Sequence, residues 1–108
     1  MSYSEYGLAK IPGTLGMTKL KNALVKIDPA LTVALKNERV NGQLQGCSGF
    51  VTNPSTGKIV YISTDCNHGT SRGALYRTAT TTRDFSGGAN RFAAYDELPR
   101  AVVELLAK

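Results

Sequence analysis

The chain has 108 residues, of which 42% are hydrophobic and 19% charged, and its formal net charge is +5. This length fits one domain, and the composition excludes a chain that is disordered throughout. No apolar run approaches the ~20 residues of a membrane-spanning helix, and residues 1–6 lack the basic start and apolar stretch of a signal peptide. We therefore expect a cytoplasmic protein that makes no contact with membranes.

The first third of the chain is predicted to hold an arm and then a helix. Residues 1–13 have no apolar periodicity, so we expect an N-terminal arm before a single α+β domain over residues 14–108. Residues 14–28 place their apolar side chains on one arc of a helix, at Met17, Leu20, Ala23, Leu24 and Ile27. Asp28-Pro29 ends this helix, because a residue before proline disfavours the α conformation.

The middle of the chain predicts antiparallel strands. Apolar and polar residues alternate over 31–36, and Asn41-Gly42 is a strong hairpin signal, because both turn residues need positive φ. The return strand covers 44–52, where Gly46 and Gly49 indicate a bulge or a close approach of two backbones. Residues 53–57 form a second turn, and 58–64 form a strand whose middle is apolar on both faces.

The last third predicts two polar loops, at 65–73 and 81–89, around a strand at 74–80. A short strand over 90–95 precedes a helix that begins near Glu97, with Asp96 as its N-cap and Pro99 in its first turn. Strands joined by short turns pair as antiparallel neighbours. The expected fold is an α+β two-layer sandwich: a meander of four or five strands with an N-terminal and a C-terminal helix packed on one face.

One loop carries residue types that are found at catalytic and metal sites. Cys66 and His68 are the minimum set for a thiol nucleophile and its base, although a turn built by Asp and Asn side chains explains the same residues. If Thr52 pairs with Lys58, Cys47 pairs with Ser63 and lies at the same end of the sheet as Cys66. Asp65 would then complete a set of four possible zinc ligands, but their spacing matches no standard site. We assign no catalytic residue, metal or cofactor.

The arginines are the more specific charge signal. Five of the seven lysines fall in the first third of the chain, whereas five of the six arginines fall between residues 72 and 100, interleaved with aromatic rings. Rings that stack on bases and arginines that neutralise phosphates are the usual components of single-strand recognition. Because neighbouring residues of a strand point to opposite faces, we expect Arg77 to point outward and Tyr76 to lie in the core. Likewise at most one of Phe92 and Tyr95 belongs to the core face.

These patterns favour a small, non-enzymatic binding domain that contacts nucleic acid through its arginine-rich C-terminal half and the free face of the sheet. The predicted contact residues are Arg72, Arg77, Arg83, Phe85 and Arg91. An alternative is a protein-interaction or inhibitor module that docks on an acidic partner. A third alternative is a thiol enzyme that uses Cys66 and His68. The chain is expected to be a monomer or a homodimer paired through an exposed strand edge.

Overall fold

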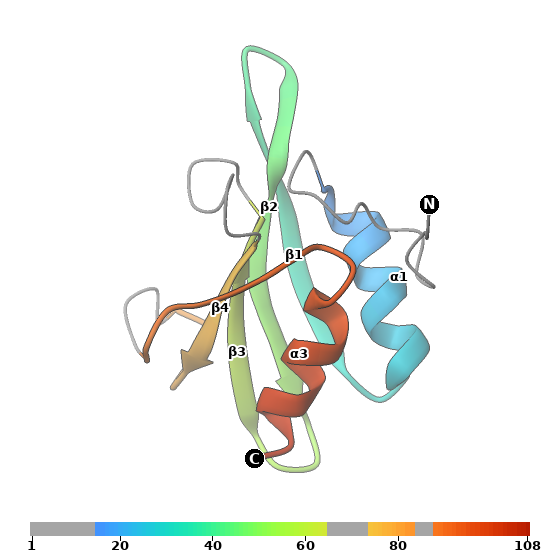
Figure 1. Cartoon of the computed structure of the whole chain (residues 1–108), viewed down its shortest axis with the longest axis vertical. Helices are drawn as coiled ribbons and strands as arrows, with labels where there is room; N and C mark the ends of the chain where they lie inside the picture. Colours follow the sequence, from blue (N-terminus) through green and yellow to red (C-terminus); the bar gives the residue numbers. More distant parts are fainter. Residues whose placement is uncertain (1–14, 65–73, 84–87) are drawn as a thin grey trace.

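The computed structural model describes residues 15–64, 74–83 and 88–108. Two helices and five strands follow one another along the chain (Figure 1): α1 (Met17–Ile27), β1 (Thr32–Val40), β2 (Gln43–Asn53), β3 (Lys58–Ser63), β4 (Ala74–Ala79), β5 (Arg91–Ala93) and α3 (Leu98–Leu106). The strands form one antiparallel sheet in the order β1-β2-β3-β4-β5. This confirms the predicted α+β fold, with a fifth strand shorter than the expected segment 90–95.

Both helices lie side by side on the same face of the sheet (Figure 1). Each helix buries its apolar arc, with Leu20 and Leu24 of α1 and Val102 of α3 fully buried. They pack against alternate residues of the central strands, among them Val51 and Ile62, which are also fully buried. The hydrophobic core therefore lies between the helices and one face of the sheet. Neither helix in the described ranges is long and apolar enough to cross a membrane.

The two hairpins form as the turn residues predict, but the second has a different register. Asn41 and Gly42 adopt φ values of 52° and 79° at the first turn. At the second turn, the side chain of Asn53 accepts a hydrogen bond from the backbone of Ser55, and Asn53 pairs with Lys58. The predicted Thr52–Lys58 pairing is therefore wrong by one residue, because Asn53 belongs to the ladder rather than to the loop.

The glycines within β2 serve both of the predicted purposes. The register of β1 and β2 shifts between Glu38 and Arg39, so that β2 carries one extra residue, and Gly46 beside it has a φ of 144°. Gly49 has a φ of 153°, and a Cβ atom there would overlap the backbone carbonyl oxygen of Ala34. The first position is a bulge and the second a close approach of two backbones.

The predicted N-cap of the last helix is wrong. The N-cap residue of α3 is Glu97, which makes no side-chain capping hydrogen bond, and one carboxylate oxygen of Asp96 is buried without a hydrogen-bond partner. The carbonyl oxygen of Ala94 accepts hydrogen bonds from the backbone N–H groups of both Glu97 and Leu98 at 2.9 Å. A preceding turn thus satisfies these donors, and the Asp96 side chain is not needed as a cap. Pro99 lies in the first turn, as predicted.

Candidate functional site

The sheet face that carries no helix, called the open face below, presents several rows of side chains across its strands, and two of these rows hold its aromatic and basic residues. The first row contains Ala34, Phe50, Tyr61 and Arg77, which are direct partners on β1, β2, β3 and β4. The second row contains Lys36, Ser48, Ser63, Leu75 and Phe92, on β1 to β5. Aromatic, basic and hydroxyl side chains therefore gather on this face through strand pairing, although they are distant in the sequence.

Three members of the first row contact one another in a stack. The ring centroids of Phe50 and Tyr61 are 5.3 Å apart, and their planes are tilted by 54°. The guanidinium carbon of Arg77 lies 4.6 Å from the centroid of the Tyr61 ring, within the range of a cation–π interaction. We call this arrangement the Phe50–Tyr61–Arg77 stack. It places a positive charge and two rings in one continuous layer.

Arg77 is held in place rather than exposed. It points to the open face, as predicted, yet only 9% of it is exposed. Its Nη1 atom donates to the side-chain oxygen of Asn90 at 3.1 Å, while its Nε atom is buried without a hydrogen-bond partner. A buried guanidinium with an unpaired N–H is costly. Arg77 therefore positions the Tyr61 ring and supplies charge beneath it, and a phosphate would need another group for direct contact.

Beside the stack lies a hollow of about 630 Å³. Phe50 and Tyr61 line it on one side, and Thr82, in the turn that follows β4, lines it as well, so this turn reaches over the open face. Lys36 and Glu38 of β1 also border it, and Glu38 accepts a hydrogen bond from the Ser48 hydroxyl at 2.9 Å. The hollow thus combines an aromatic wall with an exposed ammonium group.

The predicted arginine cluster does not share one surface. Arg83 is exposed in the turn after β4, the same turn that carries Thr82. Arg91 pairs with Tyr76, whose ring packs against the core on the helix-covered side, so Arg91 points away from the open face. Arg77 and Arg91 thus lie on opposite sides of the sheet, and the contact role of each stays a prediction. Arg72 and Phe85, the remaining predicted contact residues, lie outside the described residues.

The aromatic residues divide between the faces as strand alternation predicts. Tyr76 packs against the core, and Tyr95 is 2% exposed within it, whereas Phe92 pairs with Leu75 on the open face. Phe50, Tyr61 and Lys36 were not among the contact residues predicted from the sequence. Strand alternation could have identified them. Each lies at a strand position that points away from the core, where a large aromatic side chain is informative.

The buried thiol of Cys47 is unsuited to nucleophilic chemistry. Burial raises its pKa above the ordinary value of 9.0, and the nearby Glu38 carboxylate adds to this, while a hydrogen bond with the Thr64 hydroxyl acts in the opposite direction. A thiolate, the reactive form, is thus disfavoured at neutral pH. Asp65, Cys66 and His68 lie outside the described residues. Within the described ranges, no three His, Cys, Asp or Glu side chains are close enough to hold a metal ion.

Comparison with protein-family models, with curated proteins and with solved structures finds no match to this chain. The chemistry of the open face is therefore inferred from its own residues.

Proposed function

We propose that this protein binds single-stranded nucleic acid on the open face of its sheet. The observation that carries the proposal is the Phe50–Tyr61–Arg77 stack beside a hollow of about 630 Å³. Small-molecule sites commonly span about 300–1,000 Å³, so a nucleobase fits such a space. A base that enters the hollow stacks on the aromatic wall, an interaction worth about 1–3 kcal/mol per base.

The charges near the hollow support the same ligand. Lys36 is exposed at its border, and Arg83 is exposed in the turn that reaches over it. In this proposal the two side chains neutralise phosphates next to the bound base. Arg77 lies too deep for that task, but it fixes Tyr61 and makes the potential behind the rings positive. Binding is then expected to weaken as salt rises, because each neutralised phosphate releases counterions.

The test is the fluorescence anisotropy of labelled single-stranded DNA and RNA of about 12 nucleotides, a length within the usual site size of such proteins. We expect Tyr61→Leu to weaken binding roughly 5- to 150-fold, the loss equivalent to one stacked base. Lys36→Gln is expected to lower the steepness of the plot of log binding constant against log salt concentration by about the contribution of one phosphate contact. Arg91→Ala, on the opposite side of the sheet, is the matched control and should leave binding unchanged.

Two results would reject this function. One is an absence of binding by the parent protein to either oligonucleotide at low salt. The other is an equal loss in Arg91→Ala and Tyr61→Leu, which would place the contact away from the open face or make it a general charge effect. The folded state of each variant is checked by circular dichroism, so that a loss of structure is not mistaken for a loss of contact.

A second candidate function, docking on an acidic protein, is supported by a different part of the molecule. Helix α1 carries Lys19, Lys21 and Lys26 and no acidic residue. These lysines border the packing arc, and all three side chains are exposed. A stoichiometric protein partner whose binding survives Tyr61→Leu but not Lys21→Glu would favour this function over nucleic-acid binding.

A further inference from the structure

Strand β1 forms one edge of the sheet. Among the described residues it pairs only with β2, so one side of a nine-residue strand has no strand beside it. An edge of this kind presents backbone N–H and C=O groups that can pair with another extended segment. An added strand needs a few residues of accessible edge together with space for its alternate side chains.

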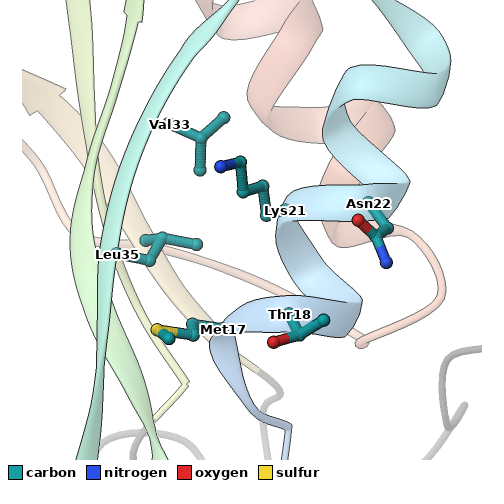
Figure 2. Close-up of a pocket in the computed structure, with 6 residues that line it drawn as sticks. All are labelled: Met17, Thr18, Lys21, Asn22, Val33 and Leu35. Carbon is teal, nitrogen blue, oxygen red and sulfur yellow. The ribbon is translucent and has the colours of Figure 1, made fainter.

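That space lies between α1 and β1. A groove of about 340 Å³ is lined by Met17, Thr18, Lys21 and Asn22 of α1 and by Val33 and Leu35 of β1. Figure 2 shows Val33 and Leu35 extending from β1 toward the helix, and the Lys21 side chain extending from the helix toward Val33. If a further strand pairs with β1, those of its side chains that point toward the helices enter this groove.

The groove combines apolar contact with positive charge. Val33 and Leu35 are half-buried, and Met17 is 37% exposed, so apolar surface remains accessible there. A flexible methionine at such a position adapts to side chains of different shape. Lys21 is exposed and brings an ammonium group into the same space. An incoming segment therefore finds an apolar wall and one cation within a single groove.

The charges of the two bordering elements determine the kind of occupant. Helix α1 and strand β1 together carry five basic residues, Lys19, Lys21, Lys26, Lys36 and Arg39, but one acidic residue, Glu38. The Glu38 carboxylate already accepts a hydrogen bond from Ser48. A second copy of the chain paired along β1 would bring two such basic surfaces together, whereas an acidic segment would neutralise them.

We infer that an extended, acidic segment of a partner protein adds to β1 as a sixth strand, with alternate side chains seated in the groove beside Lys21. This inference rests on the second candidate function, docking on an acidic protein, and specifies how that docking occurs. The backbone of β1 supplies the affinity that is independent of sequence. Because every second residue of an added strand faces the groove, the groove and Lys21 select a segment whose groove-facing positions carry both apolar and acidic residues.

The inference can be tested with the full chain and a synthetic peptide of about eight residues in which pairs of valines and pairs of glutamates alternate, so that each face of the extended peptide carries both residue types. We expect the peptide to bind and to shift the NMR signals of the β1 backbone amides. An otherwise identical peptide with lysines in place of the glutamates should not bind. Lys21→Glu should weaken binding by roughly tenfold or more, since it replaces attraction with repulsion in the groove. Lys58→Glu is the matched control, because Lys58 lies at the start of β3, and its binding should stay unchanged.

Backbone methylation of the peptide separates strand addition from simple charge attraction. Methyl groups on alternate amide nitrogens, along the peptide edge that faces β1, remove the donors that a sixth strand needs and should abolish binding. Binding that survives methylation, or that Lys21→Glu leaves intact, overturns the strand-addition model while docking on acidic proteins stands. No binding of the acidic peptide at all overturns both. A dimer of the free chain that buries the β1 amides would assign the edge to a second copy instead.

Discussion

Ser63 and Thr64 are consecutive residues, each only 1% exposed, yet they lie on opposite sides of the sheet in very different surroundings. The Thr64 hydroxyl donates to the Leu15 carbonyl oxygen at 2.7 Å and accepts from the Cys47 backbone N–H at 2.9 Å. The Thr64 carbonyl oxygen accepts from the Tyr95 hydroxyl at 3.1 Å. The Ser63 hydroxyl, on the open face, is buried with no hydrogen-bond partner.

This contrast distinguishes a face built for stability from a face with unused bonding capacity. Thr64 joins the segment before α1, strand β2 and the segment before α3 through these hydrogen bonds. On the open face, both the Ser63 hydroxyl and Arg77 Nε remain unpaired. Buried polar groups without partners are uncommon in native proteins, and they concentrate where a further role requires them. The open face is thus the better place to look for function.

The largest effect is expected where the network is broken. Thr64→Val keeps the shape of the side chain but leaves the Leu15 carbonyl and the Cys47 N–H without their partner. We expect the free energy of unfolding to fall by about 1–3 kcal/mol, measured by urea denaturation. Thr64→Ser retains the hydroxyl and is the matched control, with a loss of about 1 kcal/mol for the missing methyl group. Equal losses in the two variants would show that the hydroxyl contributes little.

A smaller effect should appear at alkaline pH on the same face. Because burial raises the pKa of the Cys47 thiol above 9.0, the folded protein keeps this proton at a pH where the unfolded chain has released it. The contribution of Cys47 to stability is therefore complete below about pH 9 and is lost as pH rises from there through the folded pKa. Urea unfolding at several pH values measures this loss. Cys47→Ala should lack this component of the alkaline decline, and an unchanged decline would contradict the assignment.

The smallest effect is expected on the open face. Ser63→Ala removes a buried hydroxyl that has no partner, so no hydrogen bond is lost. We expect the free energy of unfolding to stay constant or to rise by up to about 1 kcal/mol. A clear loss of stability would mean that the hydroxyl has a bonding role in solution, and the contrast between Ser63 and Thr64 would then weaken. Ser48→Ala, which gives up the bond to Glu38, provides the comparison.

The fold could be predicted from the sequence because its signals are local. Asn41-Gly42 fixes the first hairpin, and the apolar arc of residues 17–27 fixes the first helix and its buried side. The register of the second hairpin was missed by one residue, since it depends on whether Asn53 joins the ladder or the loop. The Asp96 cap was missed because the competing acceptor, the Ala94 carbonyl, exists only once the preceding turn has formed.

The site was harder to predict because it is made by strand pairing. Residue spacing alone gathered Arg77, Arg83 and Arg91 into one cluster, but the sheet sends Arg77 and Arg91 to opposite faces. Conversely, Phe50 and Tyr61 are eleven positions apart and become neighbours only through the β2–β3 register. The sequence shows which residues of a strand share a face. It does not show which residue of the next strand lies opposite, because this depends on the register, and the predicted β2–β3 register was wrong by one residue.

The bulge between Glu38 and Arg39 has a consequence for the motions of the molecule. Between Cys47 and the Asn41-Gly42 turn, β1 and β2 pair only with each other among the described residues. This end of their hairpin projects past the rest of the sheet (Figure 1). A two-stranded ribbon is marginal by itself, so its hydrogen bonds open locally while the five-stranded part stays closed. The extra residue of β2 lies at the junction and interrupts the ladder there. We expect it to act as a hinge between a body whose amides exchange slowly with solvent and a tip whose amides exchange rapidly.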